Sequence, residues 1–138
     1  MSNLPFRSLT PALAVAPQLT PDAMAEAARL GFKTLISNRP DGEEPGQPTA
    51  AEVAAAAAAA GLAFHHIPVR GGPGPAEIDA TQAVLAEAET PVLAFCRSGT
   101  RSIVTWSLCQ ATIGAMSRGE LAGLGRAAGY DLSGVLGA

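Results

Sequence analysis

The chain has 138 residues, of which 48% are hydrophobic and 15% charged, and its net charge is −3. This length predicts a single domain, residues 1–138, with room for one core. The acidic balance and the lack of a basic patch interleaved with aromatic residues argue against nucleic acid as a partner. No stretch approaches 18 consecutive apolar residues, so we expect no membrane span.

The two cysteines, Cys96 and Cys109, stand in neither a disulfide pattern nor a metal-ligand pattern. Such usage is typical of a reducing compartment. Residues 1–10 also lack the basic and then apolar regions of a signal peptide. We therefore expect a cytoplasmic protein that holds no metal and no cofactor.

Apolar runs and helix signals alternate along the chain. Thr20, Pro21 and Asp22 form a helix start with Thr20 as its cap, and Thr49 and Glu52 form a capping box. Strands are predicted at residues 12–16, 32–37, 63–69 and 91–95, and helices at 20–30, 49–60, 75–88, 102–110 and 117–128, with a last short turn capped by Asp131. This alternation predicts an α/β domain with a mainly parallel central sheet flanked by helices on both faces.

Three loops carry most of the polar candidates, namely residues 38–44, 66–72 and 96–101. Each follows a predicted strand. Ligands of parallel sheets bind outside the carboxyl ends of the strands. We therefore expect the three loops to gather at one edge of the sheet.

The most informative stretch is residues 92–102, where an apolar strand ends directly at Cys96 and a helix follows Arg101. This arrangement makes backbone N–H groups converge on one point, here beside a sulfur. The helix N-terminus and up to two guanidinium groups favour negative charge, so Cys96 is predicted to be a thiolate nucleophile. Arg101 is predicted to hold the anion. The other members of the anion or substrate loop are Arg97, Ser98, Gly99, Thr100 and Ser102.

Several residues carry two interpretations. Asn38 and Arg39 either line the pocket or form turns and loop pairs, and Arg70 is either an additional anion contact or a solvated arginine. Ser102 either donates a hydrogen bond to the thiolate or caps the helix. Cys109 lies roughly 10 Å or more along that helix. This exceeds the Cα separation of about 7 Å that a disulfide allows, so Cys109 is expected to be a buried hydrophobe.

Cys96-Arg97-Ser98-Gly99-Thr100-Arg101-Ser102 resembles the active-site loop of a rhodanese, a sulfurtransferase. The surrounding layout is similar to that of the dual-specificity protein phosphatases. Residues 9–136 resemble a small bacterial family between the two, the phosphatase-like domain also found attached to beta-lactamase-like hydrolases and often labelled a sulfur transferase. The further shared segments are Gly31-Phe32-Lys33-Thr34 and Asn38-Arg39-Pro40-Asp41-Gly42-Glu43. The resemblance implies a dual-specificity phosphatase-like fold with a rhodanese-like loop.

Two departures from the phosphatase pattern favour sulfur transfer. Phosphatases of this type place five residues between cysteine and arginine, whereas four separate Cys96 from Arg101. They also keep an aspartate about thirty residues before the cysteine, and residues 64–70 contain no carboxylate. A shorter ring leaves less room for a tetrahedral phosphoryl group, and a leaving thiolate needs no general acid.

We therefore predict a sulfurtransferase that moves sulfane sulfur from thiosulfate or a low-molecular-weight persulfide to a thiol through a Cys96 persulfide. Its partners would be that sulfur donor and thiol acceptor, together with a sulfide-oxidation enzyme. The alternative is a phosphatase of the protein tyrosine or dual-specificity type that forms a cysteinyl-phosphate, with Asp41 as the general acid. A second alternative is a non-enzymatic module that binds an anion or senses redox state.

Overall fold

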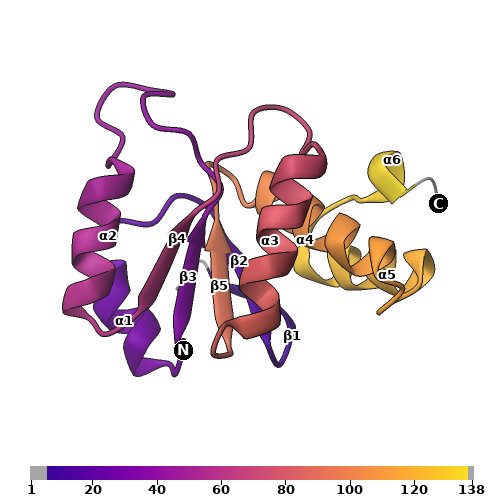
Figure 1. The fold of residues 1–138 in the computed structure, drawn as a ribbon, viewed down its shortest axis with the longest axis horizontal. Helices are drawn as coiled ribbons and strands as arrows, with labels where there is room; N and C mark the ends of the chain where they lie inside the picture. Colours follow the sequence, from indigo (N-terminus) through magenta and orange to yellow (C-terminus); the bar gives the residue numbers. More distant parts are fainter. Residues whose placement is uncertain (1–5, 137–138) are drawn as a thin grey trace.

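The structure, a computed structural model, describes residues 6–136 and contains one sheet of five short strands (Figure 1). The strand order is β1-β2-β5-β3-β4. In chain order the strands are β1 (Arg7–Thr10), β2 (Leu13–Ala16), β3 (Thr34–Ser37), β4 (Ala63–His66) and β5 (Val92–Phe95). The prediction of a mainly parallel α/β sheet is confirmed, because β2, β5, β3 and β4 pair in parallel.

Strand β1 was not predicted, and it pairs antiparallel with β2. Only Leu9 of its four residues is buried, so the strand lacks the apolar alternation that would reveal it in the sequence. The hairpin turn is held by Thr10, whose Oγ1 accepts hydrogen bonds from the backbone N of Ala12 and of Leu13, each at 3.1 Å. Strand β1 is first in the strand order and forms one edge of the sheet.

Six helices occur within residues 6–136. They are α1 (Ala23–Arg29), α2 (Ala50–Ala59), α3 (Pro75–Glu87), α4 (Thr100–Thr112), α5 (Arg118–Ala128) and α6 (Ser133–Leu136). The capping box of Thr49 and Glu52 is present as predicted. The cap of α1 differs from the prediction: Asp22 occupies the N-cap position, while Thr20 lies in the preceding turn and accepts a hydrogen bond from the backbone N of Ala23 through its carbonyl oxygen.

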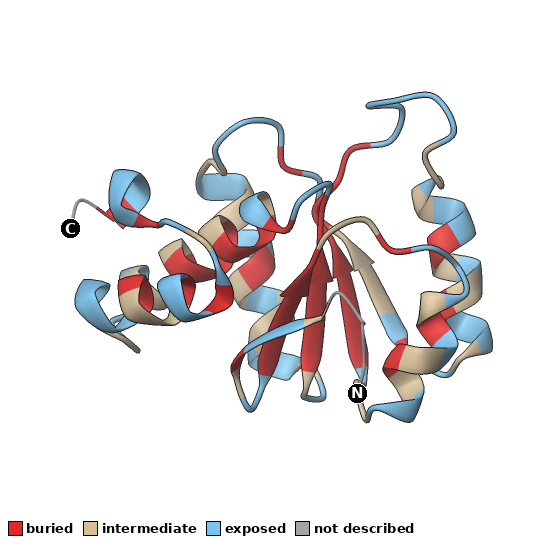
Figure 2. Ribbon diagram, turned by 180° about the vertical axis from the view of Figure 1, so that it is seen from behind, coloured by how far each residue is buried: buried red, intermediate tan, exposed pale blue. Residues whose placement is uncertain are grey.

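Helices cover both faces of the sheet, so the core has two halves (Figures 1 and 2). Helices α1 and α2 pack on the side to which Leu35 and Leu93 point. Helices α4 and α5 pack on the other side, against Ile36 and Ala94. Successive strand residues therefore enter opposite halves, as a pleated strand requires. In residues 6–136 no helix combines the length and the apolar character that crossing a bilayer requires.

The alanine-rich helix α2 lies close to the sheet because its inward residues are small. Val53 and Ala57 are its buried positions, and Ala57 has no exposed surface. Neighbouring Ala58 points to solvent. The helix therefore offers two alanines with the same helix propensity but different surroundings.

We predict that Ala57→Leu destabilises the domain by about 1–3 kcal/mol, because the larger side chain overpacks the contact between helix and sheet. Ala58→Leu is the matched control and should change the free energy of unfolding by less than about 0.5 kcal/mol. Urea denaturation of the two variants measures the difference. Equal destabilisation by both would contradict the packing described for α2.

Candidate active site

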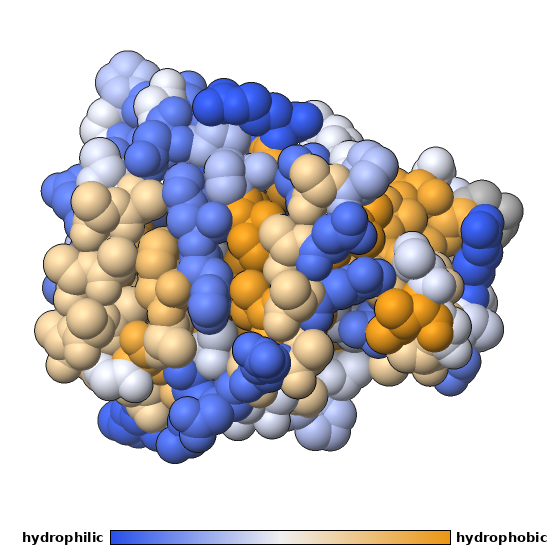
Figure 3. Space-filling view, in the orientation of Figure 1, coloured by the Kyte–Doolittle hydropathy of each residue, from blue (hydrophilic) through white to orange (hydrophobic). Residues whose placement is uncertain are grey.

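The three predicted loops meet at the carboxyl ends of the parallel strands, and Asn38 joins them. Its backbone N donates to the carbonyl oxygen of Phe95 at 2.8 Å, and its side-chain Nδ2 donates to that of Ile67 at 2.9 Å. The backbone N of Val69 donates to the carbonyl oxygen of Asn38 at 2.9 Å. Asn38 is buried, so these contacts fit loop pairing, the second of its two interpretations. The upper edge in Figure 3, where these loops lie, is mostly hydrophilic.

Cys96 directly follows β5, and the chain then turns around its sulfur. The backbone N–H of Gly99 donates to Cys96 Sγ at 3.1 Å, and only 1% of Cys96 is exposed. Gly99 adopts φ +91°, a left-handed conformation that glycine accepts readily, and helix α4 begins at the next residue. The backbone N of Gln18 donates to the carbonyl oxygen of Arg97 at 3.2 Å, which fastens the loop to the segment after β2.

Arg101 lies on the first turn of α4 and is held by both neighbouring loops. Its Nη1 and Nη2 each donate to a carboxylate oxygen of Glu43 at 2.8 Å, and Nη1 also donates to the carbonyl oxygen of Val69 at 2.9 Å. Glu43 raises the pKa of Arg101, and nearby Cys96 adds a smaller contribution in the same direction. The fork of the Glu43 carboxylate therefore fixes the Arg101 guanidinium, whose charge interacts with Cys96.

Glu43 is a residue of the site to which the sequence assigned no role. Hydrogen bonding to Arg101 lowers its pKa to about 2, with a smaller contribution from Arg39. Glu43 is therefore ionised throughout the neutral range. The one sequence feature that points to Glu43 is its place in the loop after β3, which is predicted to reach the site.

Arg39 organises the loop after β3 from inside. Its side chain is 2% exposed and donates to Gln18 Oε1 at 2.9 Å, Glu43 Oε1 at 3.0 Å and Glu44 Oε1 at 2.8 Å. The carbonyl oxygen of Arg39 lies 2.9 Å from Nε2 of His66. Arg39 thus positions Glu43, which in turn positions Arg101, and these contacts fit its loop-pairing interpretation.

Asp41 lies in the same loop and is exposed. Its Oδ1 accepts a hydrogen bond from the backbone N of Ala50 at 2.8 Å, at the start of α2. Asp41 also lines a small hollow together with Arg39 and Phe95, the residue before Cys96. The carboxylate is therefore placed on the active-site side of the sheet.

The remaining candidates differ in exposure. Arg70, Arg97, Ser98 and Thr100 are exposed. Ser102 is 1% exposed, and within residues 6–136 its hydroxyl has no hydrogen-bond partner. Ser102 does not cap α4, because Gly99 occupies the N-cap position.

Cys109 is buried, as predicted. Only 1% of it is exposed, and its Sγ lies 3.5 Å from the carbonyl oxygen of Ile78. Burial raises the pKa of the Cys109 thiol to about 11. A thiol in this state is a poor nucleophile at neutral pH, so Cys109 is not a candidate nucleophile.

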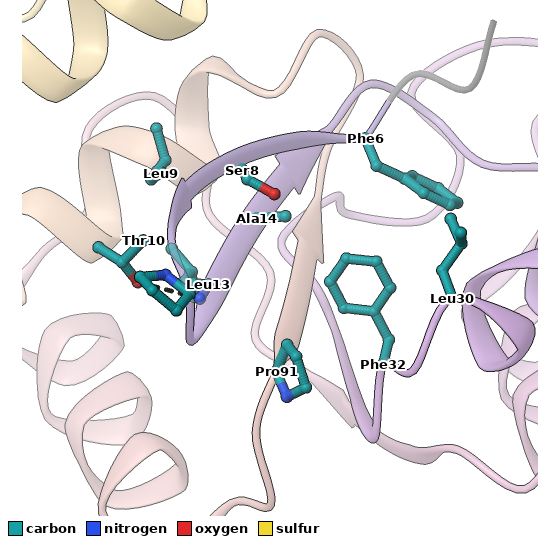
Figure 4. Close-up of a pocket in the computed structure, with 10 residues that line it drawn as sticks. Phe6, Ser8, Leu9, Thr10, Leu13, Ala14, Leu30, Phe32 and Pro91 are labelled. Atoms are coloured by element: carbon teal, nitrogen blue, oxygen red, sulfur yellow. Dashed lines mark hydrogen bonds between the residues drawn. The ribbon is translucent and has the colours of Figure 1, made fainter. Parts of the chain in front are cut away.

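A larger hollow of about 710 Å³ lies at the opposite edge of the sheet (Figure 4). Its lining includes Leu13, Phe32 and Pro91, at the amino-terminal ends of β2, β3 and β5. The strand direction therefore separates this hollow from the loop of Cys96.

The mainly parallel sheet therefore ends in a cysteine loop beside which buried Arg39 and half-buried Arg101 both bind Glu43. Residues 5–113 match the family described as "Beta-lactamase hydrolase-like protein, phosphatase-like domain". The chain belongs to this family, which confirms the predicted resemblance.

Comparison with known proteins agrees with this assignment. A beta-lactamase hydrolase-like protein of Xylella fastidiosa is 42% identical over 121 residues, which cover 87% of this chain and 28% of that protein. The chain thus spans about a quarter of the length of that relative. A candidate phosphatase from Neisseria meningitidis, known from its crystal structure, is 35% identical in sequence to this chain. The two structures superpose with a TM-score of 0.86 over 98% of this chain and 96% of that one. Kinase-associated phosphatase shares the fold, with a TM-score of 0.69 at 15% identity over 93% of this chain and 86% of that one.

The prediction of a rhodanese-like sulfurtransferase with a Cys96 persulfide is wrong. The matching family is described as phosphatase-like, and the solved structure with 35% identity is of a candidate phosphatase. The spacing between Cys96 and Arg101 does not alone set the reach of Arg101, because Glu43 and Val69 of neighbouring loops also fix its guanidinium. The lack of a carboxylate in residues 64–70 does not exclude a phosphatase, because the loop after β3 supplies carboxylates at this edge, among them Asp41, the acid of the predicted alternative.

We predict that Glu43→Gln lowers the free energy of unfolding by about 1 kcal/mol at pH 7, because a neutral amide replaces a charge-assisted pair that is partly open to solvent. The folded-state pKa of about 2 lies below the ordinary value of 4.5. The ionised Glu43 carboxylate therefore contributes its full stabilisation of the fold above pH 4.5, and this stabilisation is lost as the pH falls toward 2. The difference in free energy of unfolding between wild type and Glu43→Gln should therefore narrow as the pH falls. Urea denaturation between pH 7 and pH 3 measures it.

The control is Glu26→Gln, which removes a surface pair with Arg29, whose side chain is 71% exposed. Its effect should be smaller at every pH, since exposed pairs contribute little. A difference between wild type and Glu43→Gln that stays constant down to pH 3 would contradict the assigned role of Glu43.

Proposed function

We propose that this domain is a phosphatase of the protein tyrosine or dual-specificity class, which hydrolyses phosphoric monoesters through a cysteinyl-phosphate on Cys96. The observation that supports it most is the cradle around Cys96 Sγ, where the Gly99 N–H donates at 3.1 Å and the charge of the Arg101 guanidinium acts on the thiol. Both donors suit an anion that approaches the sulfur. The likeness to the candidate phosphatase of Neisseria meningitidis supports the same reaction.

The first step transfers the phosphoryl group to sulfur. The Cys96 thiolate attacks phosphorus, a P–S bond forms, and the P–O bond to the leaving group breaks. Arg101 and the loop amides stabilise the charge on the three phosphoryl oxygens. Because Glu43 and Val69 already hold Arg101, little reorganisation is required as that charge redistributes.

The leaving oxygen needs a proton, and we assign its donation to Asp41. Glu43 is unsuited, because its pKa of about 2 keeps it ionised and both of its oxygens are bound to Arg101. Asp41 lies in the same loop and is exposed, so a substrate bound at this edge has access to it. Its bond to the backbone N of Ala50 uses one carboxylate oxygen.

The second step releases phosphate. Water attacks phosphorus and gives a proton to Asp41, and the P–S bond breaks with its electron pair returning to Cys96. Ser102 is assigned to this step, because its buried hydroxyl has no other partner within residues 6–136 and is available to donate to the departing thiolate. The cycle ends with the thiolate and the protonated Asp41 restored.

We further place this reaction in the cytoplasm. Both cysteines are free, and a catalytic thiolate survives best where thiols are kept reduced. Whole-cell fractionation with an antibody against the natural protein tests this placement.

We predict that the domain hydrolyses an aryl phosphate such as p-nitrophenyl phosphate and that Cys96→Ser reduces kcat by about 10³-fold or more, since the hydroxyl is a far weaker nucleophile. Asp41→Asn should reduce kcat by about 10²- to 10⁴-fold, because nitrophenolate leaves without a proton donor but water attack on the cysteinyl-phosphate loses its base. Steady-state release of p-nitrophenol measures both effects.

Asp79→Asn is the matched control, because this exposed aspartate lies on α3 and belongs to none of the three loops. Its kcat should equal that of the wild type. Full activity in Cys96→Ser, or no turnover by the folded wild type, would contradict the proposed function. Unchanged kcat in Asp41→Asn would remove Asp41 from the mechanism and leave Cys96 in place.

A further inference from the structure

Tyr130 reaches the cysteine loop from a distant part of the chain. It follows α5 and lies outside residues 5–113, which match the family. Its hydroxyl donates a hydrogen bond to the carbonyl oxygen of Ser98 at 3.0 Å. A side chain from the carboxyl-terminal segment therefore contacts the backbone of the candidate active site.

This carbonyl belongs to the same peptide unit as the amide that faces the sulfur. The C=O of Ser98 and the N–H of Gly99 point in opposite directions across one planar, trans peptide bond. The carbonyl end accepts from Tyr130, and the N–H end donates to Cys96 Sγ at 3.1 Å. The peptide plane is therefore fixed from both sides, with the tyrosine opposite the sulfur.

Tyr130 packs so closely against the cysteine loop that position 99 has no room for a side chain. A Cβ atom at Gly99 would lie 2.2 Å from the Tyr130 hydroxyl oxygen and 3.1 Å from its Cζ. Gly99 also has φ +91°, which side chains resist. The hydroxyl is thus packed directly against the turn that aims the amide.

Tyr130 is itself held in place. Its backbone N donates to the carbonyl oxygen of Gly125 at 2.8 Å, and the Arg7 guanidinium lies 5.9 Å from the centre of its ring. Arg7 also donates to the carbonyl oxygen of Ala128 at 2.7 Å. Burial raises the pKa of Tyr130, so the hydroxyl stays protonated and remains a donor.

We propose that Tyr130 is a positioning residue for the nucleophile: through the Ser98 carbonyl it orients and polarises the Gly99 amide toward Cys96 Sγ and so favours the thiolate. A hydrogen bond accepted by a carbonyl strengthens the N–H of the same peptide as a donor. The inference rests on the proposed function only in taking Cys96 as the nucleophile. The charged groups that also act here are Arg101 on α4, paired with Glu43, and Arg7 on β1, beside Tyr130.

The test is Tyr130→Phe, which keeps the ring and removes the hydroxyl. The rate of alkylation of Cys96 by iodoacetamide is measured against pH, with the modified residue located by peptide mass spectrometry. We expect the midpoint of this profile to move to higher pH by about half a unit, because a weaker amide donor stabilises the thiolate less. Alkylation requires no phosphatase turnover, so failure of this proposal is distinguishable from failure of the proposed function.

Ser117→Ala is the matched control, because it removes the side-chain cap of α5, the helix that precedes Tyr130, without touching the loop. It should lower thermal stability and leave the midpoint unchanged. A midpoint in Tyr130→Phe equal to that of Ser117→Ala, or moved to lower pH, would overturn the proposal.

A second measurement tests the same contact through stability. Gly99→Ala should lower the melting temperature less in the Tyr130→Phe background than in the wild type, because the clash at 2.2 Å is with the hydroxyl that the phenylalanine lacks. Additive losses in the double variant would overturn the close packing on which the proposal depends.

Discussion

The pairing of Arg101 with Glu43 is the interaction on which the site depends. It joins the first turn of α4 to the loop after β3 through two hydrogen bonds of 2.8 Å each, and Val69 adds a third from the loop after β4. One guanidinium therefore links the loops of three adjacent strands. Arg39, buried beneath, supports the carboxylate from the other side. The cation beside Cys96 is placed by this chain of contacts rather than by its own helix alone.

The Gly99 amide is placed by a second chain of contacts, which begins far away in the sequence. Arg7 on β1 lies by the ring of Tyr130, Tyr130 binds the Ser98 carbonyl, and the same peptide unit presents its N–H to the sulfur. The antiparallel strand β1 and the segment after α5 thus both contribute to the loop. Two separate sets of contacts therefore influence Cys96 Sγ. One places the charge of Arg101, and the other places the N–H dipole of Gly99.

The sequence predicted the parallel sheet, the flanking helices and the gathering of three loops, because apolar runs, capping boxes and strand-end topology are local signals. It missed β1, whose single buried residue leaves no pattern. It pointed to Cys96 and Arg101 as candidates but not to Glu43 or Tyr130, because these two reach the site through contacts across long separations in the chain. The choice of sulfur over phosphorus was wrong for a related reason: loop length describes the chain from Cys96 to Arg101, whereas Glu43 and Val69 of other loops also hold Arg101.

The central claim is that Cys96 carries a phosphoryl group during turnover. The most direct measurement is rapid acid quenching of Asp41→Asn during reaction with an aryl phosphate, followed by intact-mass analysis and peptide mapping. Water attack is slowed in this variant when Asp41 serves as its base, so the account predicts one added phosphoryl group, located on Cys96 and absent from the Cys96→Ser double variant. Turnover of the ester without any phosphorylated Cys96, or with the label on another residue, would contradict it.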